Sequence, residues 1–267
     1  MTWDSVAMYV FSGTGNTLRA ARALEGVFVE AGASVHLAPL ERGFREEDLE
    51  GADLLGVGFP VAAFTTYPPV WEALQALPPG RGKPLFAFAT MAGAALGLGG
   101  AVRALVRRKG YTPYGYREFI MPSNYLRKEA APTERDQEIL AAGEAAARAF
   151  GEALRTGRQP WKGSGLAGPL QSLGRSRFVW NWMAHSSFSE FSADPDRCVR
   201  CGRCARLCPA GNIAWQEGLL PVWQDRCVVC QRCAAVCPHD AVRLPKGAVP
   251  YRAADPEIPE DGRPAGA

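Results

Sequence analysis

The order of apolar and polar residues over positions 1–156 switches repeatedly between two periods. Short apolar runs typical of buried strands lie near 6–11, 34–38, 53–58, 84–90 and 112–120. Apolar residues at three- and four-residue spacing indicate helices near 18–28, 69–77, 98–109 and 133–154. Strands that alternate with helices of this length predict a five-stranded parallel sheet in a doubly wound α/β fold.

The first apolar run enters a loop of small residues just before the first helix. The loop consists of Ser12, Gly13, Thr14, Gly15, Asn16 and Thr17. In such a turn, free backbone N–H groups and the positive end of the helix dipole converge on an anion. The loop lacks the lysine of a P-loop, and Leu18 stands where a dinucleotide fingerprint needs a third glycine. Hydroxyl and amide donors without a charge suit the phosphate of a mononucleotide, with an ordinary glycine-rich turn as the alternative.

This loop, on the first strand of an α/β pattern, resembles the FMN phosphate loop of flavodoxins. The resemblance implies that the loops after the third, fourth and fifth strands enclose the isoalloxazine ring. The positions expected beside the ring are Phe59, Pro60, Val61, Thr90, Met91, Ala92, Gly93, Asn124 and Tyr125. For Phe64, Tyr67 and Trp71, core packing and a lid over the ring remain open alternatives.

All eight cysteines lie in two blocks of the form C-x2-C-x2-C-x3-C-P, at 198–209 and 227–238. Bacterial ferredoxins with two [4Fe-4S] clusters have this spacing, and the fourth cysteine of each run binds the other cluster. The blocks repeat at an offset of 29 residues, with 10 of 18 positions identical between 196–213 and 225–242. The expected ligands are Cys198, Cys201, Cys204 and Cys237 for cluster one, and Cys227, Cys230, Cys233 and Cys208 for cluster two.

Disulfides and zinc are the alternatives for these cysteines. Disulfides would need an exported protein, and zinc favours separated C-x2-C pairs, often with histidine. The second block departs from the ferredoxin pattern at Gln231, where the first block has Gly202. We expect this glutamine to strain or shield the second cluster without removing a ligand.

The composition divides the chain into four parts. We expect a flavodoxin-like domain over 1–156, an aromatic-rich linker over 157–192, a small α+β ferredoxin domain over 193–246 and a disordered tail over 247–267. The linker is either a strap between the two domains or a lid over the flavin. The proline and charge content of the last part favours disorder.

Charge and hydropathy limit the partners. The formal net charge of +3 does not by itself indicate a nucleic-acid partner, and the arginines of 193–246 form either a solvated surface or a docking face for an acidic redox partner. The uncharged run 84–102 contains glycines and a proline, so it fits a buried strand and loop better than a membrane span. The N-terminus fits a strand rather than a signal peptide, and we expect a cytoplasmic location.

Together, the two parts resemble bacterial and archaeal flavodoxin–ferredoxin fusion proteins. The resemblance implies electron transfer between FMN and two [4Fe-4S] clusters, to or from a redox partner. A flavin-dependent reductase fed by the clusters is one alternative, with Tyr67, Tyr125 or His185 as candidate proton donors. A ferredoxin whose flavodoxin-like part binds no flavin and acts as a docking module is another.

Overall fold

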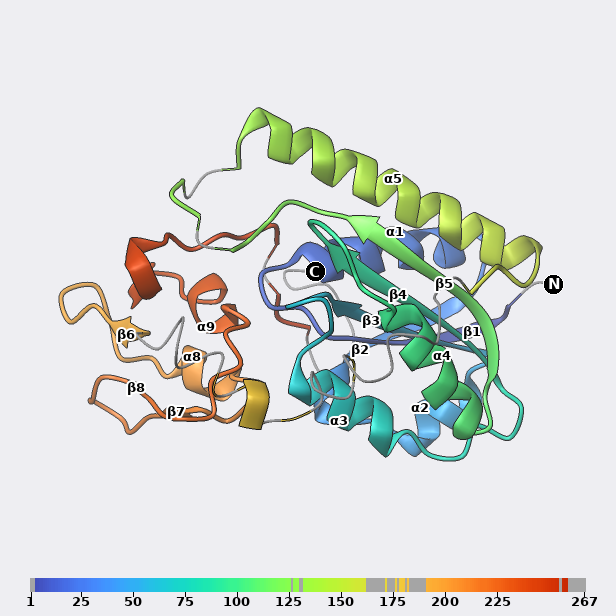
Figure 1. The fold of residues 1–267 in the computed structure, drawn as a ribbon, viewed down its shortest axis with the longest axis horizontal. Helices are drawn as coiled ribbons and strands as arrows, with labels where there is room; N and C mark the ends of the chain where they lie inside the picture. Colours follow the sequence, from blue (N-terminus) through green and yellow to red (C-terminus); the bar gives the residue numbers. More distant parts are fainter. Residues whose placement is uncertain are drawn as a thin grey trace.

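The computed structural model describes residues 3–125, 127–129, 132–161, 171, 176, 178–180, 182, 191–254 and 256–258. Its larger part is a five-stranded parallel sheet with the order β2-β1-β3-β4-β5 (Figure 1). The strands are β1 (Ser5–Val10), β2 (Ser34–Pro39), β3 (Leu54–Pro60), β4 (Pro84–Met91) and β5 (Thr112–Ile120). This is the flavodoxin-like strand order, and its switch point lies at β1 and β3. The predicted fold is confirmed.

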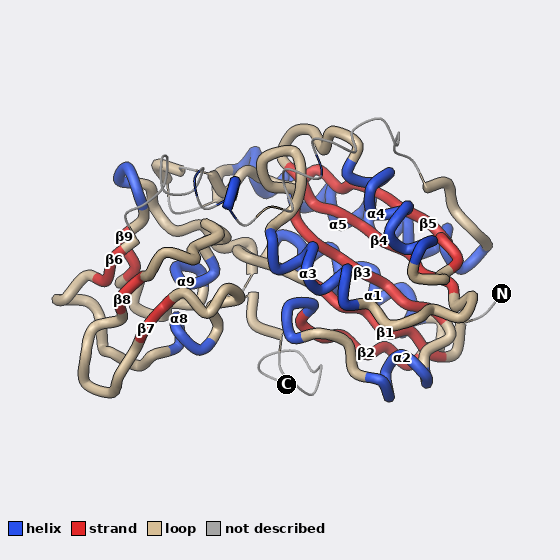
Figure 2. Tube along the Cα trace, turned by 60° about the horizontal axis from the view of Figure 1, so that its bottom comes forward, coloured by secondary structure: helices blue, strands red, loops and turns tan. Residues whose placement is uncertain are grey.

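Helices cover both faces of this sheet (Figure 2). On one face lie α2 (Glu46–Gly51), α3 (Pro68–Ala76) and α4 (Leu98–Arg108), and on the other lie α1 (Asn16–Glu30) and α5 (Glu134–Thr156). Successive strand residues point to opposite faces. Tyr9 therefore packs in the core under α2, α3 and α4, whereas Met8 packs in the core under α1 and α5.

The cysteine-rich part is built from two short antiparallel pairs and two single helical turns. Strand β6 (Ser192–Ala193) pairs with β9 (Val242–Arg243), and β7 (Ile213–Ala214) pairs with β8 (Val222–Trp223). The turns are α8 (Arg203–Arg206) and α9 (Arg232–Ala235), and η3 (Pro245–Gly247) follows β9. Each helical turn carries the third cysteine of its block, so the sequence repeat is also a structural repeat.

A buried ion pair joins the two parts of the chain. Arg232 of α9 pairs with Glu41 in the short helix η1 (Leu40–Arg42), and each side chain is only 7% exposed. Nε of Arg232 also donates a hydrogen bond to the carbonyl of Ser12 over 2.9 Å. The guanidinium lies 4.9 Å from the centre of the Phe11 ring, close enough for a cation–π contact. These contacts fix α9 against the end of β1.

The expectation of a disordered tail over 247–267 is wrong for the described residues of that segment. Tyr251 is 1% exposed, and Ile258 is buried in the core beneath α1 and α5. The N–H of Ala253 donates to the carbonyl of Thr14 over 2.8 Å. Composition suggested exposure to solvent, but it carries no information about the apolar sites that distant elements provide for these two side chains.

We expect the Glu41–Arg232 pair to be essential for docking of the two parts. Glu41→Gln should lower the free energy of unfolding by about 3 kcal/mol, because it leaves the Arg232 charge buried without its partner. Urea denaturation of the anaerobically purified protein, followed by circular dichroism, measures this loss.

The control is Glu47→Gln, which removes the exposed ion pair between Glu47 and Arg45. This second variant should unfold as the unchanged protein does, since exposed pairs contribute little. Equal stability of the two variants would show that the buried pair has no special role.

Candidate functional site

A cavity of about 650 Å³ lies at the carboxyl ends of the strands, where the two parts of the chain meet. Its volume is in the range of small-molecule and cofactor sites. The predicted site residues that line it are Ser12, Gly13, Thr14, Asn16, Thr17, Pro60, Val61, Thr90, Met91, Ala92, Gly93, Asn124 and Tyr125. Among the described lining residues none carries a formal charge, so any ligand meets neutral donors and acceptors.

Two predicted residues do not line the cavity. Phe59 is fully buried in the core with α3 and α4, because the strand alternation directs its side chain into the sheet packing. The expected contact between Phe59 and the ring is therefore wrong. Gly15 has a φ of 98°, and a Cβ at this position would meet the backbone nitrogen of Ala254 at 2.2 Å. Gly15 thus packs on the C-terminal segment.

The small-residue loop presents free hydrogen-bond donors. Within the described part of the chain, no backbone N–H of residues 13–17 donates to a protein acceptor, and α1 begins without a side-chain cap. Ser12 Oγ accepts from the N–H of Leu18 at 3.3 Å, and Thr14 Oγ1 accepts from Asn124 Nδ2 at 3.0 Å. Both hydroxyls keep their own hydrogen for a further acceptor. The loop can therefore bind an anion with neutral groups only.

Side chains from distant segments hold the loops around the cavity together. The hydroxyls of Thr17 and Thr90 share a hydrogen bond of 2.8 Å. Nε2 of Gln171, a fully buried linker residue, donates to the carbonyls of Leu96 at 2.7 Å and Phe64 at 3.2 Å. Gln171 thus joins the loops that follow β3 and β4. Sequence reasoning missed it, because no local pattern distinguishes one polar residue in a linker.

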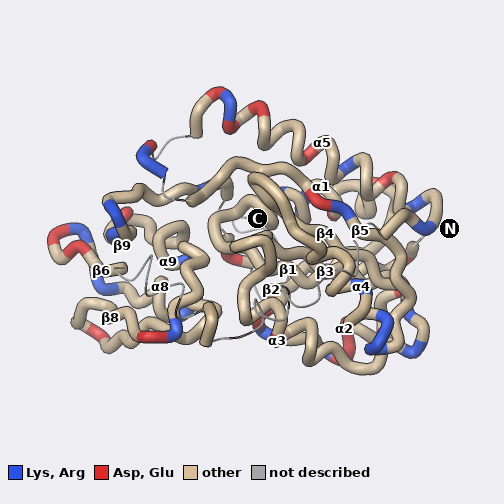
Figure 3. The backbone as a smooth tube through the Cα atoms, in the orientation of Figure 1, with Lys and Arg blue, Asp and Glu red and all other residues tan. Residues whose placement is uncertain are grey.

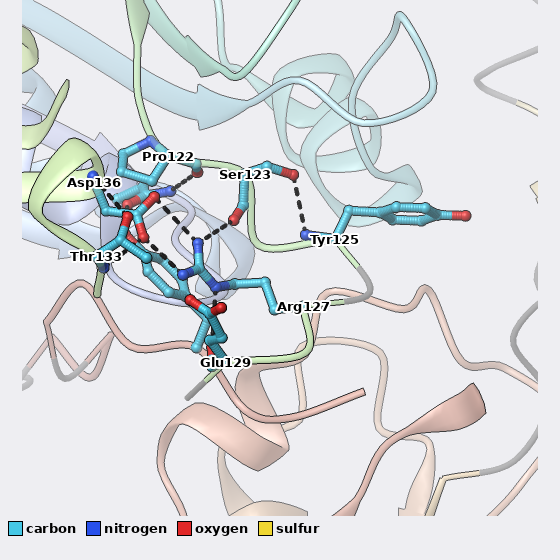
Figure 4. A network of polar contacts seen from close by, with 9 residues as sticks. Pro122, Ser123, Tyr125, Arg127, Glu129, Thr133 and Asp136 are labelled. Carbon is cyan, nitrogen blue, oxygen red and sulfur yellow. Dashed lines mark hydrogen bonds and ion pairs between the residues drawn. The ribbon is translucent and has the colours of Figure 1, made fainter. Parts of the chain in front are cut away.

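The segment that follows β5 is fixed by a polar network (Figure 4). Arg127 forms a two-pronged ion pair with Asp136 at the start of α5 and donates to the carbonyl of Ser123 over 3.1 Å. This guanidinium lowers the pKa of Asp136 to about 2. Asn16 Nδ2 donates to the carbonyl of Pro122 over 2.9 Å. These bonds place the segment with Asn124 and Tyr125 against the small-residue loop.

The second cysteine block supplies another wall of the cavity, formed by Val228, Val229, Cys230 and Gln231. A Cβ on Gly13 would meet the carbonyl oxygen of Cys230 at 2.2 Å, so the two backbones are in direct contact. No sequence pattern predicts this wall, because the two segments are more than 200 positions apart.

Two aromatic residues, Trp180 and Tyr67, line the cavity next to that wall. Trp180 of the linker donates from Nε1 to the carbonyl of Val228 over 3.1 Å, and its ring meets Tyr67 edge-on with centroids 5.4 Å apart. Burial raises the pKa of the Tyr67 phenol, and the nearby thiols of Cys230 and Cys227 raise it further, so the phenol keeps its proton. Most of the linker, with His185, lies outside the described residues.

The structure brings the cysteines together in the two predicted sets. Burial raises the pKa of Cys204 to about 11, and the neighbouring thiols that add to this shift are those of Cys237, Cys198 and Cys201. In the second set, burial raises the pKa of Cys230 to about 12, and Cys208 and Cys227 add to it. Burial also raises the pKa of Cys233, and the neighbouring thiols that add to this shift are those of Cys230, Cys227 and Cys208. Each set therefore includes the fourth cysteine of the other block.

The donor chemistry of these sets fits iron–sulfur clusters. Thiolates are the protein ligands of [4Fe-4S] clusters, and hydrogen bonds to sulfur tune them. Backbone N–H groups donate to Sγ of Cys208 and of Cys237, each over 3.3 Å. Among the described residues no three His, Cys, Asp or Glu side chains are placed to hold one metal ion. A cluster has an iron for each of its four thiolates, so its ligands need not converge on one point.

The two sets differ in their distance from solvent. Cys230 is buried in the cavity wall, whereas Cys201 is exposed to solvent. The cysteines of cluster one line a separate small pocket with Pro221 and His239. The second set is therefore the inner one, next to the cavity, and the first set is the outer one.

We expect each fourth cysteine to serve the cluster of the other block. Cys208→Ser should abolish the cluster of the second block, and Cys237→Ser that of the first, with iron and sulfide falling by about half in each variant. Electron paramagnetic resonance of the reduced proteins should give one spectrum for Cys208→Ser and Cys227→Ser. Cys237→Ser and Cys198→Ser should share a different one. If Cys208→Ser instead shared its spectrum with Cys198→Ser, and Cys237→Ser with Cys227→Ser, each fourth cysteine would bind the cluster of its own block. That result would contradict the prediction.

Comparisons with known proteins found one family model and several solved structures that are similar to part of the chain. Residues 192–244 match the family model described as a 4Fe-4S dicluster domain. No curated protein matches the chain. Part of the chain is similar to solved flavodoxins. One comes from the domain Archaea, with 18% identity, 56% of this chain and 98% of that chain covered and a TM-score of 0.39. Another is two-electron reduced flavodoxin from Megasphaera elsdenii, with 27% identity, 54% and 98% covered and a TM-score of 0.40.

The flavodiiron protein from Giardia intestinalis is also similar, with 18% identity, 57% of this chain and 36% of that chain covered and a TM-score of 0.40.

Within the part of the chain that the structure describes, no helix is both long enough and apolar enough to cross a membrane. The larger part of the chain thus has the flavodoxin-like strand order, and residues 192–244 match the model of a 4Fe-4S dicluster domain.

Proposed function

We propose that this chain is an electron-transfer protein that holds FMN in its cavity and two [4Fe-4S] clusters in its cysteine sets. Clusters carry single electrons, whereas a flavin can take up two and release them one at a time. One observation carries the proposal: Cys230, which we assign to the inner cluster, is itself part of the cavity wall. A cofactor in the cavity and a cluster on this thiolate would be direct neighbours.

The cavity fits FMN better than a dinucleotide. The loop of residues 12–17 offers hydroxyl and backbone donors to one phosphate, and no basic side chain among the described lining residues stands ready for a second one. Pro60, Val61 and Thr90 would contact the ring from the strand ends, and Asn124 and Tyr125 would close the remaining side.

In this proposal the protein positions the flavin beside the inner cluster and excludes water between them. Cys230, Trp180 and Tyr67 are all buried and form a continuous surface at the junction. Exclusion of water limits proton leakage and side reactions at the reduced centres. No side chain has to act as an acid or a base for this step.

The outer cluster set would face the redox partner. Cys201, Arg200 and Val199 are exposed around it, and the side chain of Arg197 is 55% exposed. Figure 3 shows basic positions on the loops near α8 and β9. Exposed arginines beside Cys201 suit an acidic partner, because charge complementarity speeds encounter and orients docking.

A flavin-dependent reductase with its own organic substrate is the second candidate. It is supported by the exposure of Tyr125, Ala92 and Gly93 at the mouth of the cavity, where a substrate could reach a bound flavin. Turnover of an organic acceptor, lost in Tyr125→Phe, would favour this candidate over a pure carrier.

We expect the anaerobically purified protein to show cluster absorbance near 400 nm and to release FMN on acid treatment. After removal of the flavin, FMN should bind about 100-fold more tightly than riboflavin, because hydrogen bonds to the charged phosphate each contribute about 1.5–3 kcal/mol. Quenching of flavin fluorescence measures both affinities. Equal affinities would exclude the phosphate site, and iron without any flavin binding would favour the docking-module alternative.

We also expect oxidation of the reduced protein to depend on the charge of the oxidant. The rate with ferricyanide, an anion, should fall as salt is added, whereas the rate with hexaamminecobalt(III), a cation, should rise. Arg200→Glu should weaken both trends in stopped-flow measurements.

Arg107→Glu on α4 is the control, because it makes the same change in net charge at an exposed position on the other domain. It should leave both salt dependences nearly unchanged. If the two variants behaved alike, only the overall charge would matter and the docking surface would be disproved.

A further inference from the structure

The internal repeat contains one position where the two cysteine blocks differ in an unusual way. Gln231 corresponds to Gly202, and both have a left-handed backbone, with φ of 60° and 72°. Glycine adopts this conformation without strain, but a residue with a Cβ does so only at a cost in free energy. The second block therefore keeps a strained glutamine where the fold itself needs only glycine.

The surroundings explain why only the second block can carry a side chain here. A Cβ on Gly202 would meet the indole of Trp215 at 2.6 Å, so any larger residue is excluded. Gln231 instead lies in the wall of the cavity between the two domains. Strain that persists beside a ligand cavity is a reason to look for a function.

Among the described residues, only one of the two polar atoms of the Gln231 amide has a hydrogen-bond partner. Nε2 donates to the carbonyl of Asn124 over 2.9 Å, and Asn124 in turn donates to Thr14 of the small-residue loop. A backbone carbonyl can only accept, which fixes the orientation of the Gln231 amide. The other amide atom, Oε1, is buried and has no hydrogen-bond partner among the described residues. The residue as a whole is 8% exposed.

We propose that Gln231 is a flavin-recognition residue supplied by the iron–sulfur domain, with Oε1 accepting a hydrogen bond from the bound flavin. This inference rests on the proposed binding of FMN in the cavity. An acceptor needs a donor, and an ionised phosphate has none, so the partner is a ring N–H or a ribityl hydroxyl. A single hydrogen bond would account for both the tolerated strain and the unpaired oxygen.

The role also links the two cofactor sites. Gln231 stands between Cys230 and Cys233, two ligands of the inner cluster set, and reaches the flavodoxin-like domain through Asn124. The same short loop would therefore bind the inner cluster with its thiolates and the flavin with its amide.

Gln231→Gly tests the proposal, because glycine relieves the backbone strain while it removes the amide. We expect the dissociation constant for FMN to rise about tenfold, the effect of one lost hydrogen bond. The thermal midpoint of the flavin-free, cluster-loaded protein should change little, because relief of the left-handed strain offsets the lost hydrogen bond from Nε2 to Asn124. A purely structural side chain would instead lower this midpoint.

Two further variants keep the result interpretable. Gln231→Met retains the volume without the amide and should weaken FMN binding as much as glycine does. An FMN affinity equal to that of the unchanged protein would overturn the proposed hydrogen bond to the flavin.

Arg200→Gly is the control: it removes left-handed strain in the first block, away from the cavity, and should leave FMN affinity within about twofold. Failure of the unchanged protein to bind FMN would disprove the proposed function. Tight binding by all variants would disprove only the role of Gln231.

Discussion

The direct contact between Gly13 and the carbonyl of Cys230 is the constraint on which the rest of the structure depends. No side chain fits at Gly13, because even a Cβ would overlap that carbonyl. The contact brings the small-residue loop of one domain against a proposed cluster ligand of the other. It also makes the cavity a property of the whole chain, since neither domain encloses it alone. A flavodoxin-like sheet normally opens its switch point to solvent, and here the second cysteine block covers it.

Several independent links hold this contact in one geometry. Arg232 binds Glu41 and the carbonyl of Ser12, while Trp180 binds the carbonyl of Val228. Burial of a charged pair contributes little net stability compared with apolar packing, but it strongly penalises any arrangement that separates the charges. The ion pair therefore mainly selects the docked geometry. The aromatic contact between Tyr67 and Trp180 adds buried apolar area that stabilises this geometry.

Sequence patterns predicted the parts of the structure that depend on local order. The strands and helices follow from periodicity, and the cysteine sets follow from spacing and repetition. Phe59 was assigned to the wrong surroundings because the strand end was known only approximately, and a shift of one residue exchanges the two faces of a strand. Gln171, Trp180 and Tyr251 could not be assigned, because their contacts join segments that the pattern treats separately. The missing information was how the two domains dock.

The repeat itself provides the strongest argument about how the two blocks divide their work. Both blocks keep the same cysteine spacing and the same left-handed turns, so the requirements of cluster binding are shared. Differences between equivalent positions must then reflect different surroundings. Arg200 is exposed on the outer block, whereas its counterpart Val229 lines the cavity. Arg203 pairs with Glu257 of the C-terminal segment, whereas its counterpart Arg232 pairs with Glu41. One block has thus become a charged outer surface and the other an apolar inner wall, as expected for two clusters in series between a buried cofactor and a partner protein.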